Sequence, residues 1–272
     1  MTIQQIIELA YQEDIPHGDI TTNGLGLSQV TGKAHLIAKE DLVLSGKNIF
    51  EQCLKYISPH CELKWYFDDG DFILDKQTVC LIEGNMIDII QAERVALNFL
   101  GHLSGIATLT KCFVKQVEHT KCKILDTRKT LPLYRSLEKT AVVHGGGQNH
   151  RMNLSDAILI KENHIEMMGG LSQAVKAIRS KGNLPIEVEV KTLEEVKMSV
   201  SLDVHRLLLD NMDNSKMKEC LDSIPPTVQT EASGNMNLER VRSVAELGVD
   251  FISVGSLTHS APCADFSLIF KM

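Results

Sequence analysis

The chain lacks an excess of positive charge. Its 28 Lys and Arg residues stand against 35 Asp and Glu residues, which gives a formal net charge of −7 at pH 7. A protein that binds nucleic acids generally needs surplus basic side chains to neutralise the phosphates. The composition therefore argues against a general nucleic-acid binder, although it leaves room for a local basic pocket.

Paired cysteines and long apolar runs are also missing. The seven cysteines are scattered and never form C-x-x-C, so we expect reduced thiols in a core rather than disulfides or a zinc site. Residues 1–19 have no basic segment and no apolar run long enough for a signal peptide or a membrane span. These absences lead us to expect a cytoplasmic protein that does not contact membranes.

The pattern of apolar residues predicts two parts. Apolar spacing indicates a helix over 2–12 and a long helix over 87–118, which Ser104 and Gly105 could kink or break. Between these helices, short apolar runs at 33–84 are typical of strands. The second half has six β-rich runs, most of them separated by segments with helical periodicity, at 121–127, 156–161, 185–190, 206–210, 227–232 and 250–255.

Alternating strands and helices indicate βαβ units and a parallel sheet. Because the nucleotide-fold glycine fingerprint is absent, we favour an α/β barrel over a doubly wound sheet. We place the first domain at 1–112 and the barrel at 113–264, and 265–272 could rejoin the first domain.

Each of the six β-rich runs stops on polar or charged groups. In an α/β barrel the carboxyl ends of the strands form the active-site rim, so these groups are expected to share a pocket. They are Asp126, Thr127, Arg128, Lys129, Lys161, Glu187, Glu189, Asp210, Asn211, Glu231, Ser233, Gly234, Asn235, Gly255 and Ser256.

The segment 126–165 is a basic island, with six Lys or Arg residues against four Asp or Glu residues. Like charges held together repel unless anions compensate them, so Arg128, Arg151 and Lys161 could neutralise two carboxylates. Glycines 145–147 would let the backbone approach a ligand, or could simply form a flexible loop.

Other members of this island have simpler explanations. Arg135 and Lys139, beside Glu138, are expected on a solvated helix face. His144 and His164 could be capping or core histidines.

Acidic side chains inside a barrel also call for a partner. Glu187 and Glu189 alternate with valines, so in a closed barrel they point inward, where an unpaired carboxylate is unfavourable. A Mg²⁺ ion shared with Asp210 would compensate them, since Mg²⁺ binds oxygen ligands. The segments around Gly234 and Gly255 follow the last two strands, where barrels commonly bind phosphate.

The motifs DTRKT, LEK, GGG and NHR within 126–165 resemble the quinolinate phosphoribosyltransferase family. The resemblance continues along the chain through EDIPHGDITT, AERVALNFLGHLSGIAT, IEVEV, LLLDNM, EASGN and ISVGSLTHS. It implies an N-terminal α/β sandwich followed by an incomplete, open α/β barrel. It also implies a homodimer, which could assemble further, with sites shared across the interface.

The resemblance further implies that quinolinate and phosphoribosyl pyrophosphate form nicotinate mononucleotide, pyrophosphate and CO₂ with Mg²⁺, in NAD biosynthesis. The cations would hold the carboxylates of quinolinate, and the glycine segments would hold the 5′-phosphate. The expected catalytic residues are Lys129, Lys161, Glu189 and Asp210, the last two also facing Mg²⁺-pyrophosphate. The expected substrate-binding residues are Arg94, Thr127, Arg128, His150, Arg151, Lys161, Ser233, Gly234, Asn235, Gly255 and Ser256.

Arg94 is assigned by the resemblance alone, as a residue that enters the partner subunit's site. Thr140 and Gln148 depart from the family pattern, which puts the fine fit of the substrate in question. Two alternatives remain: a related enzyme acting on another aromatic acid, as in proteins encoded with molybdate transporters, and a catalytically silent anion-binding module.

Overall fold

The computed structural model describes residues 2–26, 30–182 and 184–271, and the chain divides into two compact units. The first unit comprises Met1–Lys111, Pro132–Gly146 and Ala261–Met272, and the second comprises Cys112–Leu131 and Gly147–Ser260. The segment Pro132–Gly146 therefore clusters with the first unit, whereas the sequence analysis assigned it to the barrel. The described part of the chain contains no helix that is both long and apolar enough to cross a membrane.

An antiparallel sheet organises the first unit. Its strand order is β12-β1-β5-β3, and the pairing of β12 with β1 joins the C-terminal tail to this unit. Buried and partly exposed residues alternate along the second half of β1, as expected for a strand with one face on the core. The strands of the unit are β1 (Thr31–Ala38), β2 (Leu42–Val43), β3 (Glu62–Trp65), β4 (Phe72–Ile73), β5 (Thr78–Asn85) and β12 (Phe266–Lys271).

The helices of the first unit are α1 (Ile3–Asp14), α2 (Ile20–Gly24), α3 (Lys47–Ile57), α5 (Arg135–His144) and α4 (Met86–Val117), which continues into the second unit. The hydroxyl of Tyr11 on α1 donates to the carbonyls of Cys53 on α3 and Ala92 on α4, at 2.9 and 3.2 Å. The prediction of strands alone over 33–84 is wrong, because α3 lies in this interval and buries Phe50 against Trp65.

Helix α4 is continuous through Ser104 and Gly105, so the helix is not broken in two there. Its glycines serve close packing instead. A Cβ atom on Gly105 would lie 1.8 Å from the carbonyl oxygen of Pro262, and one on Gly101 would lie 2.7 Å from that of Ala264. The small residues thus let the chain leading into β12 lie directly on the helix.

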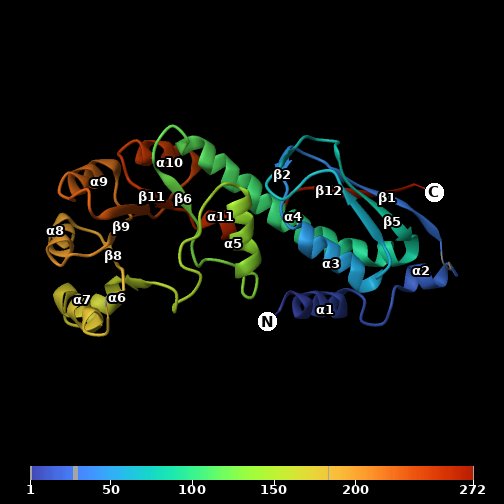
Figure 1. Ribbon diagram of the computed structural model, residues 1–272, viewed down its shortest axis with the longest axis horizontal. Helices are drawn as coiled ribbons and strands as arrows, with labels where there is room; N and C mark the ends of the chain where they lie inside the picture. The colour runs from blue at the N-terminus through green and yellow to red at the C-terminus, as the bar shows by residue number, and fades with distance from the viewer. Residues whose placement is uncertain (1, 27–29, 183, 272) are drawn as a thin grey trace. The chain divides into compact units, whose positions relative to one another are not determined.

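The second unit is a six-stranded parallel sheet surrounded by helices (Figure 1). Its order is β6-β11-β10-β9-β8-β7, with β6 and β7 at the two edges, so the barrel is open between the first two strands in sequence. The strands are β6 (Lys123–Leu125), β7 (Ile158–Ile160), β8 (Ile186–Val190), β9 (Arg206–Asp210), β10 (Gln229–Ser233) and β11 (Phe251–Ser253). The helices are α6 (Glu162–Met167), α7 (Leu171–Arg179), α8 (Leu193–Ser201), α9 (Asn214–Leu221), α10 (Leu238–Ala245) and α11 (Ser256–His259).

The parallel register brings all six carboxyl ends to one rim. Strands β8 and β9 pair Val188 with Leu207, and β9 and β10 pair Leu209 with Ala232. The apolar residues of these strands are buried, whereas the polar residues that end them meet at the rim. This fold confirms the predicted open α/β barrel and positions its candidate site.

Candidate active site

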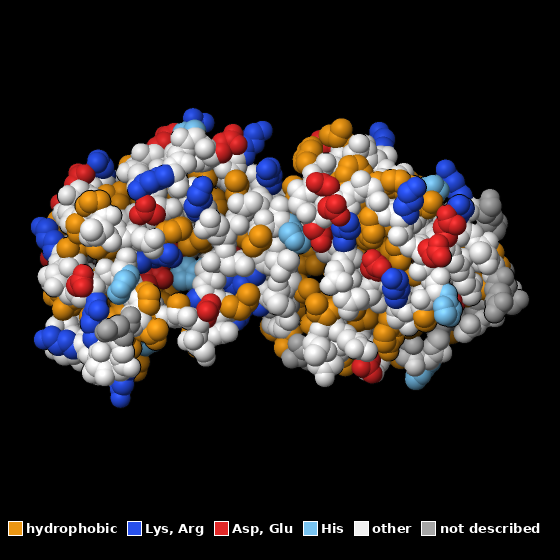
Figure 2. Space-filling view, in the orientation of Figure 1, with side chains coloured by type: hydrophobic (Ala, Val, Ile, Leu, Met, Phe, Trp, Pro, Cys, Tyr) orange, Lys and Arg blue, Asp and Glu red, His pale blue; other side chains and the backbone are white. Residues whose placement is uncertain are grey.

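A cavity of about 720 Å³ lies at the carboxyl ends of the barrel strands. Figure 2 shows basic, acidic and histidine side chains gathered in a recess on the face of this unit. The sequence-predicted residues that line the cavity are Thr127, Arg128, Lys129, His150, Arg151, Lys161, Glu189, Asp210, Asn211, Glu231, Ser233, Gly234, Asn235, Gly255 and Ser256. Asp126 and Glu187, which were expected in the same pocket, are not part of its lining within the described chain. Arg94 is not part of this lining within the described chain; it is an exposed residue of α4 in the first unit.

Cations occupy one side of the cavity. Burial lowers the pKa of Arg151, and the positive charge of Arg128 lowers it further. The guanidinium of Arg151 is positioned by a 2.9 Å hydrogen bond from Nη1 to the carbonyl of Ala157. Two like charges held near each other in a partly buried place favour binding of an anion, which would remove the repulsion between them.

Lys161 also reaches the cavity, directly after β7. Its ammonium lies 2.6 Å from Oε2 of Glu189, and its backbone N–H donates to Nδ1 of His164. His164 therefore caps the start of α6, one of the two interpretations left open for it.

Side chains with oxygen atoms also line the rim. Oδ1 of Asp210 accepts a 2.7 Å hydrogen bond from Oγ of Ser233, and Oδ2 accepts from the amide of Asn211. Gly234 has φ +89°, and a Cβ atom there would lie 2.1 Å from Oδ1 of Asn211. Only glycine fits this turn, which exposes backbone atoms to the cavity.

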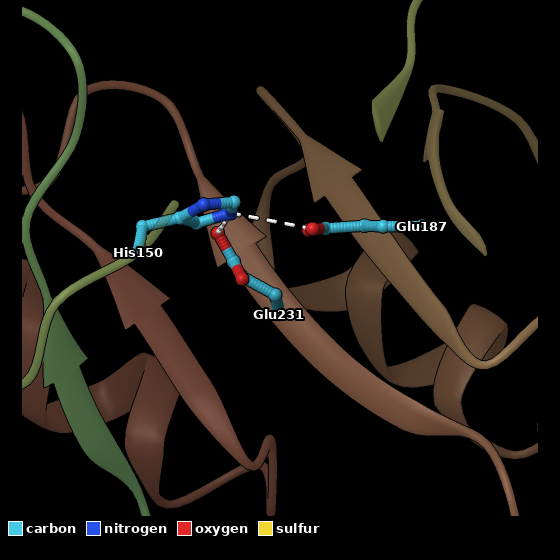
Figure 3. Close-up of side chains that lie close together, drawn as sticks. All are labelled: His150, Glu187 and Glu231. Atoms are coloured by element: carbon cyan, nitrogen blue, oxygen red, sulfur yellow. Dashed lines mark ion pairs between the residues drawn. The ribbon is translucent and has the colours of Figure 1, made fainter. Parts of the chain in front are cut away.

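A buried charge network forms the cavity floor. The sequence analysis assigned His150 to substrate binding and Glu187 to a Mg²⁺ site with Asp210, but it did not predict that these two residues lie together with Glu231. Nε2 of His150 lies 3.3 Å from Oε2 of Glu187 and 3.5 Å from Oε1 of Glu231, and Figure 3 shows the three side chains converging. Nη1 of Arg206 is 3.2 Å from Oε2 of Glu231, and Oγ of Ser253 donates to Oε1. The inward alternation of Glu187 and Glu189 was the available signal, but Arg206 and Ser253 come from other strands.

The ring of His150 faces protein groups on both sides. The backbone N–H of Arg151 donates to Nδ1 at 2.7 Å, while Nε2 faces the two glutamates. His150 therefore belongs to the floor network, and it also lines the cavity together with Arg128, Arg151 and Lys161.

Three other expectations for the basic island need revision. The side chains of Glu138 and Lys139 are fully buried, so the predicted solvated helix face is wrong; Nε2 of His102 lies 2.8 Å from Oε1 of Glu138. Glycines 145–147 do not line the cavity, and a Cβ on Gly145 would clash with the carbonyl of Ala107. Nδ1 of His144 forms a 2.9 Å hydrogen bond with Oγ of Ser45.

Comparison with known proteins adds to this geometry. The profile described as "Quinolinate phosphoribosyl transferase, C-terminal domain" matches residues 106–269, and the corresponding N-terminal domain profile matches 19–104. The chain is 37% identical to quinolinate phosphoribosyltransferase [decarboxylating] 2b, mitochondrial, of Nicotiana tabacum, over 98% of this chain and 81% of that protein. It is 38% identical to a probable nicotinate-nucleotide pyrophosphorylase [carboxylating] of Synechocystis sp., over 94% and 88% of the two chains.

Solved structures agree in fold. The nicotinate-nucleotide pyrophosphorylase of Ehrlichia chaffeensis superposes with a TM-score of 0.95 at 37% identity, covering 100% of this chain and 99% of that one. The corresponding protein of Francisella tularensis gives 0.95 at 35% identity, over 99% and 96% of the chains. The profiles, the relatives and the open barrel lead to one conclusion: this chain belongs to the quinolinate phosphoribosyltransferase family.

Proposed function

We propose that this protein is a decarboxylating quinolinate phosphoribosyltransferase of NAD biosynthesis. It would convert quinolinate and phosphoribosyl pyrophosphate to nicotinate mononucleotide, pyrophosphate and CO₂. The observation that carries the proposal is the convergence of Arg128, Arg151 and Lys161 with Glu189 and Asp210 in one cavity of a family member. Three cations suit a dicarboxylate, and the acidic groups suit a ribose and a metal-bound leaving group.

The chemistry needs positioning more than a covalent nucleophile. The pyridine nitrogen attacks C1′ of the ribose, and positive charge develops on the sugar as pyrophosphate leaves. Arg128, Arg151 and Lys161 orient the ring through its carboxylates, and Lys129 stabilises the leaving group. The resulting pyridinium nitrogen accepts the electron pair released when the adjacent carboxylate departs as CO₂.

The residues at the rim fit a Mg²⁺ ion. Asp210 and Glu189 offer carboxylate oxygens beside the hydroxyl of Ser233, and such hard oxygen ligands are those that Mg²⁺ prefers. When bound, the ion would neutralise charge on the pyrophosphate. The ammonium of Lys161 would keep Glu189 oriented through their 2.6 Å ion pair.

The turns after β10 and β11 support a phosphate site. Ser233, Gly234 and Asn235 line one side of the cavity, and Gly255 and Ser256 line another. Hydroxyls and backbone N–H groups of this kind bind the 5′-phosphate of a ribose, and the last two strands of α/β barrels commonly carry such a site.

A homodimer belongs to the same proposal. An apolar cavity of about 860 Å³ runs beside the open edge at β7, and its lining includes the well exposed Leu154, Met167 and Leu184. Apolar surface of this kind is commonly covered in an assembly. Arg94, exposed on α4 of the first unit and not among the residues that line the cavity of its own chain, would then complete the partner's site. A cytoplasmic location stays a prediction, since several relatives carry mitochondrial or chloroplastic names.

The test is release of labelled CO₂ from carboxyl-labelled quinolinate with phosphoribosyl pyrophosphate and Mg²⁺. We expect release that depends on both the second substrate and the metal, with pyrophosphate formed in equal amount. Turnover of nicotinate or another aromatic acid in place of quinolinate would favour the related-enzyme alternative. Binding of anions without pyrophosphate release would favour the silent module.

A further inference from the structure

The two arginines of the candidate site come from separate stretches of the barrel unit. Arg128 follows β6, whereas Arg151 lies before β7, and the intervening Pro132–Gly146 clusters with the first unit. Burial lowers the pKa of Arg151, and the charge of Arg128 lowers it further, so the two guanidinium groups lie within electrostatic reach of each other. Because like charges repel, the two stretches need other contacts to stay together.

Backbone hydrogen bonds supply the first of these contacts, at the edge of β6 that β11 does not occupy. The N–H of Gln148 donates to the carbonyl of Ile124 at 2.8 Å, and the N–H of Asp126 donates to the carbonyl of Gln148 at 3.1 Å. Leu125 and Gln148 thereby form a single parallel bridge. The stretch that returns toward β7 is therefore held in register with the end of β6, through backbone atoms and independently of the Gln148 side chain.

The side chain of Asp126 adds a second contact directly beyond this bridge. Asp126 is fully buried, and its Oδ1 accepts a 2.9 Å hydrogen bond from the backbone N–H of His150, 24 residues later in the chain. In a longer parallel pair, that N–H would bond to the backbone carbonyl of Asp126. The carboxylate accepts it at this point and continues the register where the regular pairing stops.

This hydrogen bond joins the residues that come immediately before the cations of both stretches. Asp126 precedes Thr127–Lys129, and His150 precedes Arg151, whose own N–H donates to Nδ1 of His150 at 2.7 Å. Asp126 is not part of the cavity lining within the described chain, so it acts on a substrate only through the residues that follow it. The bond therefore restrains the distance between the backbones that carry Arg128 and Arg151.

A fixed spacing of cations matters for a dicarboxylate but not for a monocarboxylate. The two carboxylates of quinolinate lie on neighbouring ring carbons, so both are paired only when two cationic groups stand at a matching separation. Holding the guanidinium groups at this separation before the substrate arrives also avoids the entropy cost of ordering them upon binding. A monocarboxylate such as nicotinate needs only one cation, and its binding does not depend on the separation.

We propose that Asp126 is a positioning residue, which sets the spacing of Arg128 and Arg151 and so makes the site selective for a dicarboxylate. The inference rests on the proposed function. Asp126 takes part in no step of the reaction. It bonds to the backbone of the second stretch, the two backbones place the guanidinium groups, and these groups bind the carboxylates.

The first test removes the acceptor in Asp126→Ala. The two stretches are then free to separate, so we expect the affinity for quinolinate to fall about 10-fold, the scale of one lost hydrogen bond, and that for nicotinate to stay within about twofold. Calorimetry measures quinolinate binding, and competition against quinolinate measures nicotinate binding. The selectivity, which is the dissociation constant of nicotinate divided by that of quinolinate, should therefore fall. Asp126→Asn offers an amide oxygen to the same N–H and should keep most of the selectivity.

Asp250→Ala is the matched control for a loss of stability. Oδ2 of Asp250 accepts 2.9 Å hydrogen bonds from the N–H and the hydroxyl of Thr230, so this carboxylate also ties two neighbouring stretches together. It does so at the amino ends of the barrel strands, and in the described chain it does not line the cavity. Asp250→Ala should lower the free energy of unfolding in urea and leave the selectivity unchanged.

A second comparison separates positioning from a general loosening of the site. In an Arg128→Ala background, Asp126 has no second guanidinium to place against Arg151. Adding Asp126→Ala should therefore weaken quinolinate binding much less than it does in the wild type, whereas independent effects would add. If Asp126→Ala does not fold, Asp126→Glu replaces it in both tests, because it keeps the charge but moves the acceptor by one methylene, and the same fall in selectivity is expected.

The outcomes distinguish the two proposals. A wild type that releases no CO₂ from quinolinate contradicts the proposed function itself. An active wild type whose Asp126→Ala variant keeps its selectivity, or in which the losses of Asp126→Ala and Arg128→Ala add, overturns the positioning role alone. An Asp126→Asn variant that loses as much selectivity as Asp126→Ala would also overturn it, since the charge and not the hydrogen bond would then be responsible.

Discussion

At the scale of single residues, Arg128 and Arg151 are the two arginines that line the cavity. Removing Arg128 would leave a substrate carboxylate without a charged partner. Lost hydrogen bonds to charged groups cost about 1.5–3 kcal/mol, so we expect Arg128→Ala to weaken quinolinate binding roughly 10- to 100-fold by calorimetry. Arg242→Ala, on an exposed face of α10, should leave binding unchanged. Equal affinity in Arg128→Ala would contradict the placement.

What the sequence reveals about such residues depends on where their partners lie. Lys161 was predictable because it directly follows an apolar run, and Arg128 because it lies in the polar segment just after another; strand ends meet at one rim. The burial of Lys139 and Glu138 was not predictable from the sequence. A partner of Glu138 is His102, which lies 36 residues earlier on another helix. The contact of Arg206 with Glu231 likewise depends on the register of β9 and β10, which no local pattern specifies.

At the scale of elements, strand–helix alternation predicted all six barrel strands, because buried parallel strands are short, apolar and regularly spaced. Helix α3 was missed, although Ile49, Phe50, Cys53 and Leu54 have helical spacing. They lie among short strands of similar apolar content. Their spacing, and not their apolar content, distinguishes the helix from the neighbouring strands.

Helix α4 allows a test of element packing. Alanine is ordinarily the better helix former, by about 1 kcal/mol over glycine. In Gly105→Ala, however, the new Cβ would overlap the carbonyl of Pro262, so we expect a net loss of about 1–3 kcal/mol in the free energy of unfolding. Urea denaturation measures this free energy of unfolding. Gly24→Ala, where a Cβ meets nothing within 4 Å, should be neutral or slightly stabilising; equal behaviour of both variants would refute the packing argument.

At the scale of the whole molecule, each active site of the proposed dimer contains Lys161 of one subunit and Arg94 of the other. Each single alanine variant should then be nearly inactive. In a mixed dimer, the site with native Lys161 receives native Arg94 from the other subunit, so one site of two is intact. Random assembly makes about half of the dimers mixed, which restores about a quarter of wild-type activity in co-expressed Arg94→Ala and Lys161→Ala chains.

The control for this experiment uses two residues that line the same cavity. Arg128 and Lys161 line the same cavity of one chain, so mixing Arg128→Ala with Lys161→Ala leaves every site with one defect, and no activity should return. Sedimentation of each mixture checks that dimers form. No recovery in the Arg94 pair would show that Arg94 does not complete a neighbouring site, because only a residue supplied by the other subunit can be complemented in this way. Recovery in the control pair would show instead that Arg128 and Lys161 do not act in the site of one chain.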